Sequence, residues 1–121
     1  EDKMTMKTGD LQIVRDFLDV RDVVKAYYLL LKKGRKGEVY NICSGIPTQL
    51  SEIIDMTAKI VDLKVDTVVA SEFVRPNDNP YILGDNSKLK RDTGWEKSFA
   101  LETSIRDIID YWKNVLTENN G

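Results

Sequence analysis

The chain has 121 residues, of which 31% are charged, and a formal net charge of −2. This length suits a single domain of ordinary size, and the balanced charge excludes the broad basic surface on which nucleic-acid binding depends. The sequence has no histidine, the commonest transition-metal ligand, and no cluster of cysteine and carboxylates at ligand spacing, so we expect no metal site.

Strands and helices are predicted to alternate from the start of the chain. Residues 11–17 form a strand-like run, Asp19 is a favourable N-cap, and Gly34 is a natural helix stop after two lysines. Apolar residues recur between the two at the spacing of one helical face, which predicts a helix with an apolar stripe. The stripe consists of Val20, Val23, Val24, Tyr27, Tyr28 and Leu31.

The alternation continues over the rest of the chain. Residues 39–43 form a β-branched and aromatic run that predicts a short buried strand, and Thr48 begins a second helix. Residues 64–70 alternate apolar and polar positions, which predicts a strand with one covered face. The remaining predictions are a brief strand at 81–83, a helix capped by Ser87 that stops at Gly94, a last helix with an apolar stripe over 101–116, and frayed residues at 118–121.

Neither the single cysteine nor the apolar stretches indicate an extracellular or membrane protein. Cys43 lies in an apolar run, which is typical of a buried thiol in a reducing compartment. The longest apolar stretch, around residues 26–31, is far shorter than a membrane span, and no signal-peptide pattern opens the chain. We therefore expect a soluble, cytoplasmic protein.

Arg15 and Arg75 each close a strand-like run, where a side chain can project from a sheet edge toward a shared cleft. A guanidinium is always charged and presents a rigid fork of donors that matches phosphate oxygens. Two converging arginines would form a clamp for a diphosphate. The alternative is that both form surface ion pairs, which are common in a chain so rich in charge.

Five motifs occur in the order and spacing of one known enzyme family. They are residues 15–24, residues 39–45, the pair Arg75-Pro76, residues 84–89 and the corner Thr93-Gly94-Trp95. Together they resemble the C-terminal part of the extended short-chain dehydrogenase/reductases, the NAD-dependent epimerase/dehydratase family. Within it they are most similar to the GDP-4-keto-6-deoxymannose reductases and the GDP-mannose 4,6-dehydratases. The resemblance implies an α/β fold, namely the C-terminal portion of a Rossmann-type enzyme with its smaller α/β substrate-binding domain.

The resemblance also implies that the chain is part of a longer enzyme. Residues 1–46 would supply a strand and a helix that pack on the parent Rossmann sheet, and residues 47–121 the substrate domain. The Gly-x-Gly-x-x-Gly turn that holds a dinucleotide is absent, and the chain opens with Glu1 instead of methionine. We expect an upstream Rossmann half as partner, NAD or NADP as cofactor of the parent enzyme, and no cofactor on the isolated chain.

A few site residues carry over from the family. Arg15 and Arg75 match the arginines that reach the substrate diphosphate. Asp78 stands where relatives contact the nucleotide ribose, and it equally suits a turn between two asparagines. Asn41 and Ser44 are weaker candidates for contact with the cofactor.

Other residues of interest are interpreted as structural and not as catalytic. Tyr28 and Lys32 have the Tyr-x-x-x-Lys spacing of the family's catalytic couple, but they follow the first arginine motif, whereas the family's couple precedes it. Trp95 resembles the packing residue of a Gly-Trp corner, and Tyr111 and Trp112 are expected in the core. We therefore expect no catalytic residue in this chain.

Two functions of different classes remain open. In the first, the chain is the substrate-binding region of an NAD(P)-dependent enzyme that reduces or dehydrates a GDP-linked 6-deoxyhexose, and it orients the nucleotide sugar without performing chemistry. In the second, it is a free-standing, non-catalytic module that binds a nucleotide sugar or another protein. The missing glycine turn favours the second for the chain alone, and the resemblance favours the first for a parent protein.

Overall fold

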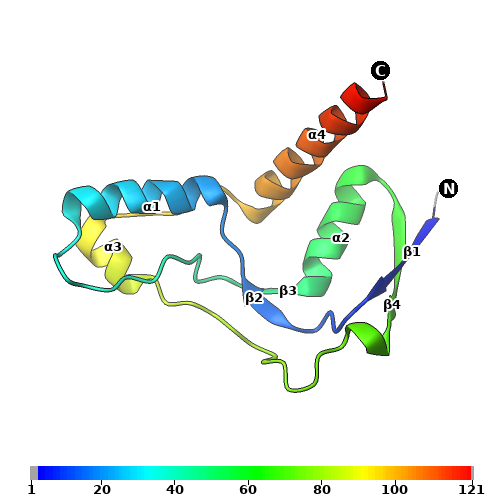
Figure 1. The fold of residues 1–121 in the computed structure, drawn as a ribbon, viewed down its shortest axis with the longest axis horizontal. Coiled ribbons are helices and arrows are strands. Elements are labelled where there is room, and N and C mark those ends of the chain that lie inside the picture. Colours follow the sequence, from blue (N-terminus) through cyan, green and yellow to red (C-terminus); the bar gives the residue numbers. More distant parts are fainter. Residues whose placement is uncertain (1–2, 121) are drawn as a thin grey trace.

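The computed structural model describes residues 3–120 and shows an open, elongated frame (Figure 1). Helices α1 and α3 lie at one end of the frame, and α2, α4 and the β1–β4 pair lie at the other. The elements are β1 (Lys3–Thr8), β2 (Val14–Asp16), α1 (Val20–Lys33), β3 (Pro47–Gln49), α2 (Leu50–Val61), β4 (Lys64–Val69), a 3₁₀ turn (Ser71–Phe73), α3 (Ser87–Thr93) and α4 (Leu101–Asn119). This order confirms a mixed α/β fold.

Helix α1 begins and ends where the sequence predicts. The Asp19 carboxylate accepts the backbone N–H of Arg21 at the N-cap, and the Gly34 N–H donates to the Leu30 carbonyl at 2.9 Å. A Cβ atom at position 34 would lie 2.6 Å from that carbonyl oxygen, so the close approach requires glycine.

The apolar stripe of α1 is left largely uncovered by the described residues, so its contact with a parent sheet stays a prediction. Leu31 is 90% exposed, and four other members of the stripe are more than half exposed. The helix instead buries Asp22 and Ala26, of which Ala26 packs with Leu89 and Trp95. The side of α1 that contacts α3 is therefore not the side that carries the apolar stripe.

The strands form two separate pairs. β1 runs parallel to β4 in a register that pairs Lys3 with Lys64, and β2 runs antiparallel to β3. The sequence did not predict β1, whereas β4 confirms the strand predicted over 64–70. The covered face predicted for that strand is wrong, because Thr67 and Val69 are exposed although α2 contacts the strand.

The strand predicted over residues 39–43 does not form within the described part of the chain. The segment has no regular structure, and Val39 is 79% exposed. A strand exists only when its backbone pairs with a neighbour, and no described strand forms a ladder with these residues. The composition favours a strand, but the pairing partner is absent.

Helices α2 and α3 form near their predicted positions with different caps. Thr48 lies in β3, and α2 begins two residues later after a capping box in which the Glu52 carboxylate accepts the Gln49 N–H at 2.6 Å. Ser87 is the first residue of α3 instead of its cap. Gly94, with a φ of 72°, ends that helix as predicted.

The last predictions are confirmed in part. The strand-like segment at 81–83 forms a single bridge between Tyr81 and Val14. Helix α4 continues to Asn119, so fraying is wrong there, and Gly121 lies outside the described residues. No helix in the described part of the chain combines the length and apolarity needed to span a bilayer.

The core is small and sits between α1 and α3. Its fully buried members are Ala26, Leu89 and Trp95. The Trp95 indole N–H also donates to the Asp22 carbonyl at 3.0 Å, which confirms this tryptophan as a packing residue. Tyr111 and Trp112 are more than half exposed on α4, so their predicted place in the core is wrong.

Candidate functional site

Arg15 and Asp78, two of the predicted substrate-binding residues, form an ion pair. Nη2 of Arg15 lies 3.1 Å from Oδ1 of Asp78, and Nη1 donates to the Val14 and Asn79 carbonyls at 2.9 and 2.8 Å. β2 supplies the arginine, and the loop before α3 supplies the carboxylate. These three bonds leave two of the five guanidinium donors for a ligand.

Arg75 lies in the turn that also carries Asp78. The Asp78 N–H donates to the Arg75 carbonyl at 3.4 Å, and Asn77 has a φ of 65°, a left-handed conformation that asparagine tolerates. A pocket of about 250 Å³ is lined by both residues and by part of segment 9–13. The guanidinium of Arg75 forms no hydrogen bond or ion pair with any residue between 3 and 120. The structure thus brings the three predicted residues to one region of the surface.

Asp16, next to Arg15 on β2, holds three distant segments together. Its carboxylate accepts the Ser44 N–H and hydroxyl at 2.8 and 2.7 Å, the Gly45 N–H at 2.9 Å and the Gly84 N–H at 3.3 Å. Burial raises the pKa of Asp16, but these hydrogen bonds outweigh that effect and keep the pKa below its usual value. No sequence motif predicted this cluster.

The cofactor candidates differ in their surroundings. Ser44 is buried, and its hydroxyl donates to Asp16 and accepts the Ile46 N–H at 3.1 Å. Asn41 is exposed on the preceding segment. The hydroxyl of Ser44 is therefore engaged inside the protein, and a cofactor role for either residue stays a prediction.

The hydrogen bonds to Asp16 predict a pH-dependent stability. A carboxylate with a lowered folded-state pKa stabilises the fold above its ordinary pKa of about 4, and the contribution is lost as pH falls through the lower folded-state value. We expect Asp16→Asn to destabilise the chain at about pH 7 and to cost less below about pH 4. Urea unfolding of both proteins at the two pH values measures this, and a cost independent of pH would contradict it.

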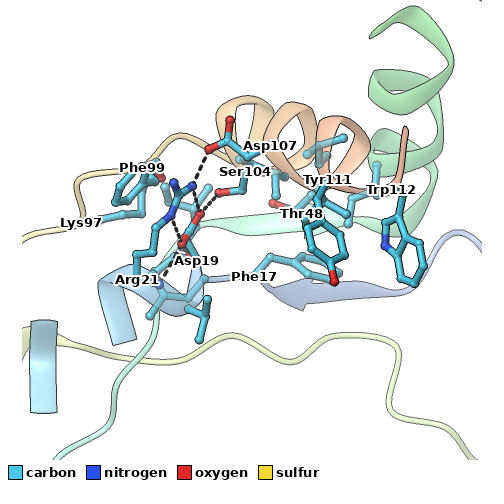
Figure 2. Close-up of a pocket in the computed structure, with 18 residues that line it drawn as sticks. Phe17, Asp19, Arg21, Thr48, Lys97, Phe99, Ser104, Asp107, Tyr111 and Trp112 are labelled. Carbon is cyan, nitrogen blue, oxygen red and sulfur yellow. Dashed lines mark hydrogen bonds and ion pairs between the residues drawn. The ribbon is translucent and has the colours of Figure 1, made fainter. Parts of the chain in front are cut away.

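A groove of about 670 Å³ lies between α4 and the junction of β2 with α1. Figure 2 shows Tyr111 and Trp112 extending from α4 toward Phe17, beside Thr48 of β3. The rest of the apolar lining consists of Leu18, Val20, Ile46, Ile53, Phe99, Leu101, Ile105 and Ile108. Sequence analysis missed the groove because it placed the two α4 aromatic residues in the core.

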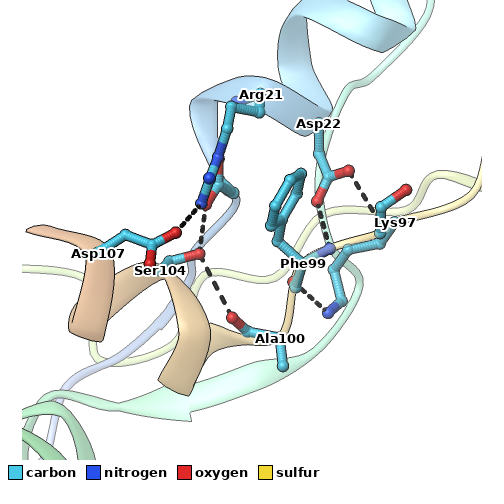
Figure 3. Close-up of polar contacts among 9 residues, drawn as sticks. Arg21, Asp22, Lys97, Phe99, Ala100, Ser104 and Asp107 are labelled. Atoms are coloured by element: carbon cyan, nitrogen blue, oxygen red, sulfur yellow. Dashed lines mark hydrogen bonds and ion pairs between the residues drawn. The ribbon is translucent and has the colours of Figure 1, made fainter.

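Polar side chains close one end of this groove. Arg21 bridges Asp19 and Asp107 at 2.9 and 2.8 Å and lies over the Phe99 ring, 3.7 Å from its centroid (Figures 2 and 3). The Ser104 hydroxyl also donates to Asp19. Hydrogen bonds from Arg21, and further from Ser104, hold the pKa of Asp19 well below its usual range despite burial.

A second carboxylate, Asp22, fastens the segment that leads into α4. It is 1% exposed and accepts the Ser98 N–H at 2.8 Å and the Phe99 N–H at 3.1 Å (Figure 3). The partners are 76 and 77 positions away in the sequence, and no local pattern connects them. Asp22 and Arg21 together attach α4 to the first turn of α1.

Other chemically interesting groups lie elsewhere. Lys32 Nζ lies 5.1 Å from the centroid of the Tyr28 ring on the exposed face of α1, and the interpretation of this pair as non-catalytic stays a prediction. Burial raises the pKa of the Cys43 thiol. Residues 3–120 contain no group of three or more side chains that could hold a metal ion.

The sequence profile of one family, described as GDP-mannose 4,6 dehydratase, matches residues 1–108. The chain belongs to the GDP-mannose 4,6-dehydratase family. The GDP-6-deoxy-D-mannose reductase of Pseudomonas aeruginosa is 34% identical to this family member over 113 residues, and the GDP-6-deoxy-D-talose 4-dehydrogenase of Aggregatibacter actinomycetemcomitans is 35% identical over 115 residues. The matches cover 93% and 94% of this chain but only 37% and 38% of the relatives' lengths.

Solved structures of related enzymes share the fold of this family member. RMD from Pseudomonas aeruginosa, solved with NADPH, matches with a TM-score of 0.84 and 34% identity over 91% of this chain and 35% of that chain. A UDP-glucose 4-epimerase from Thermotoga maritima, solved with UDP-glucose, matches with a TM-score of 0.83 and 29% identity over 93% and 36%. The Rossmann-type extended dehydrogenase fold implied by the motifs is confirmed, and the chain spans about a third of such proteins.

Proposed function

We propose that the chain is the substrate-binding region of an NAD(P)-dependent enzyme that reduces or dehydrates a GDP-linked 6-deoxyhexose. The observation that carries this proposal is the grouping of Arg15, Asp78 and Arg75 in one surface region. Arg75 lines the pocket and Arg15 is bonded to Asp78, which also lines it, and two guanidinium groups supply the charge and the donors that a diphosphate requires. The names of the two curated relatives, GDP-6-deoxy-D-mannose reductase and GDP-6-deoxy-D-talose 4-dehydrogenase, favour that substrate class.

In this proposal the chain orients the substrate and breaks no bond. Arg15 keeps two donors for phosphate oxygens, and the Arg75 guanidinium is not engaged by the described residues. Asp78 holds the Arg15 guanidinium in place through Oδ1, and its second oxygen can accept a hydrogen bond from a ribose hydroxyl. Fixing the diphosphate at both arginines would present the sugar ring in one orientation to the reacting groups.

The residues of this chain do not fit a complete NAD(P) site. The glycine turn for the pyrophosphate is absent, and the Ser44 hydroxyl is already bound to Asp16. We therefore assign the cofactor, which supplies hydride transfer when bound, to a Rossmann part outside these residues. The solved relative with NADPH supports use of such a cofactor in the family.

The exposed stripe of α1 fits contact with that Rossmann part. The stripe and the unpaired segment 39–43 both belong to residues 1–46, and a neighbouring parallel strand would complete the ladder of that segment. Residues 47–121 would then form the substrate domain. Large apolar surface of this kind is unfavourable in water and indicates a covered face.

Replacing Arg15 or Arg75 with alanine is expected to weaken substrate binding by about 1.5–3 kcal/mol, the scale of hydrogen bonds to charged groups. This corresponds to about 10- to 150-fold weaker binding. The test joins this chain to the cofactor-binding part of the Pseudomonas aeruginosa reductase and measures KM for the GDP-linked substrate. Arg15→Lys should restore only part of the loss, because an ammonium cannot form the fork.

The control variant is Arg91→Ala, which removes an exposed arginine that pairs with Asp92. Its KM should match that of the parent protein. Unchanged KM values in both the Arg15 and the Arg75 alanine variants would reject the clamp.

A free-standing binding module is the second candidate, favoured by the missing glycine turn. It predicts that the isolated chain binds GDP, UDP or dTDP, which backbone amide signals near Arg15 and Arg75 would report. A reading frame that continues upstream into a glycine turn and a Tyr-x-x-x-Lys couple would reject the module. Oxidation of NADPH by the isolated chain would overturn both candidates.

A further inference from the structure

The segment of residues 78–84 runs along β2 and is bonded to it at several points. Its first residue pairs with Arg15 in the proposed clamp. In its middle, the Val14 N–H donates to the Pro80 carbonyl at 2.9 Å, and the Val14 carbonyl accepts the Ile82 N–H at 3.0 Å. The geometry of the clamp therefore depends on how this segment is held against β2.

Asp16 holds the far end of the same segment. One carboxylate oxygen, Oδ2, accepts the Gly84 N–H at 3.3 Å and the Gly45 N–H at 2.9 Å. The other, Oδ1, accepts the N–H and the hydroxyl of Ser44 at 2.8 and 2.7 Å. A carboxylate offers about four lone pairs to donors, so these four bonds occupy the Asp16 carboxylate and leave it no acceptor for a ligand.

Gly84 is also fixed from its other side. A Cβ atom at this position would lie 2.6 Å from the Cβ atom of Cys43, so the segment approaches Cys43 more closely than a larger residue would allow. The Asn86 amide donates to the Cys43 and Ser44 carbonyls at 2.9 and 3.2 Å, which holds the next residues to the same turn. The end of the 78–84 segment is thus enclosed between Asp16 and residues 43–44.

We propose that Asp16 is a positioning residue of the nucleotide-sugar site. It fixes Gly84 at one end of the 78–84 segment and thereby places Asp78, at the other end, beside Arg15. The inference rests on the proposed function, because the group that it positions is the diphosphate clamp. In this role Asp16 touches no substrate and acts only through the Arg15–Asp78 pair.

The first test measures amide hydrogen exchange in the 121-residue chain without ligand. Asp16→Asn retains one acceptor oxygen and almost the same shape. The Val14 and Ile82 amides should be accelerated at least about tenfold more than the Leu50 amide, which is bonded to the Ile13 carbonyl on the β3 side of β2. Equal acceleration of all three would mean a general loss of stability and would overturn the proposal.

The second test measures kinetics in the enzyme formed by joining this chain to the cofactor-binding part of the Pseudomonas aeruginosa reductase. Asp16→Asn should raise KM for the GDP-linked substrate by about tenfold and leave kcat nearly unchanged, because the clamp binds the substrate without performing chemistry. In the Arg15→Ala background, the same replacement should raise KM by less than about twofold further, since the group that it positions is gone.

The control for these kinetics is Asp22→Asn. It neutralises another buried carboxylate that accepts two backbone N–H groups, but at the segment that leads into α4. Its KM should match that of the parent enzyme. Gly84→Ala is a second variant at the same contact and should raise KM as Asp16→Asn does, because the added methyl group pushes the segment away from Cys43.

The outcomes separate this inference from the proposed function. If Arg15→Ala raises KM but Asp16→Asn and Gly84→Ala do not, the positioning role is rejected and the clamp stands. Equal effects of Asp16→Asn with and without Arg15 would show that Asp16 acts independently of the clamp, and would also reject the role. If neither Arg15→Ala nor Asp16→Asn changes KM, both the clamp and the positioning role are rejected.

Discussion

Replacing Trp95 with alanine is expected to lower the free energy of unfolding by about 3–5 kcal/mol. The indole is fully buried beside Ala26 and Leu89, and its N–H is bonded to the Asp22 carbonyl. The variant would leave a cavity in a core with few fully buried residues and would also remove the indole hydrogen bond to the Asp22 carbonyl. Urea unfolding followed by circular dichroism measures the loss.

The second tryptophan of the chain is the matched control. Trp112 is more than half exposed, so Trp112→Ala should destabilise the isolated chain by less than about 1 kcal/mol. Similar losses for the two alanine variants would contradict the assignment of Trp95 as the packing residue. Trp95→Phe should recover part of the lost stability, because it fills most of the cavity.

Asp22→Ala is expected to destabilise the chain by about 3 kcal/mol, since a buried carboxylate that accepts two backbone N–H groups would be lost. The Ser98 and Phe99 N–H groups would remain in a partly buried place without an acceptor. The attachment of α4 to α1 would weaken with them. Thermal and urea unfolding measure the change.

Asp107→Ala provides the comparison for this variant. It removes the exposed partner of Arg21 and breaks another contact between α1 and α4. Exposed ion pairs contribute little to stability because water screens them, so the change should be small. A loss as large as that of Asp22→Ala would show that the exposed ion pair attaches α4 as strongly as the buried carboxylate, and would contradict this prediction.

The helices were predictable because their signals are local. Asp19 and Gly34 mark the ends of α1 through contacts within a few residues, and Gly94 ends α3 in the same way. The start of α2 was misplaced at Thr48, since the sequence does not show that this residue pairs with β2. The prediction failed for a boundary that depends on pairing with residues far away in the sequence.

Burial could not be predicted from periodicity alone. The stripe of α1 that contains Leu31 has a clear apolar pattern, yet the described residues pack against the opposite side, at Ala26. Residues 39–43 have the composition of a strand but lack a partner for their backbone. An apolar pattern predicts that a surface will be covered, but it does not show which segment covers it.

The candidate site was predictable only in part. The family motifs implied that Arg15, Arg75 and Asp78 belong to one site, and the structure places them in one region. The sequence did not indicate the role of Asp16, because its four hydrogen bonds come from residues 28 to 68 positions away. The network around Arg21 was missed for the same reason.

Strand β2 is only three residues long, and its two polar side chains serve opposite purposes. Three residue pairs with β3 and one bridge to Tyr81 set its alignment. A shift of one residue would turn each side chain to the other face of the strand, so that the Asp16 carboxylate could take the place of the Arg15 guanidinium and would leave the Ser44 and Gly84 amides without their acceptor. In the proposed diphosphate clamp, such a shift would replace a cation with an anion. Binding of a nucleotide sugar would therefore also report that this short strand has paired correctly.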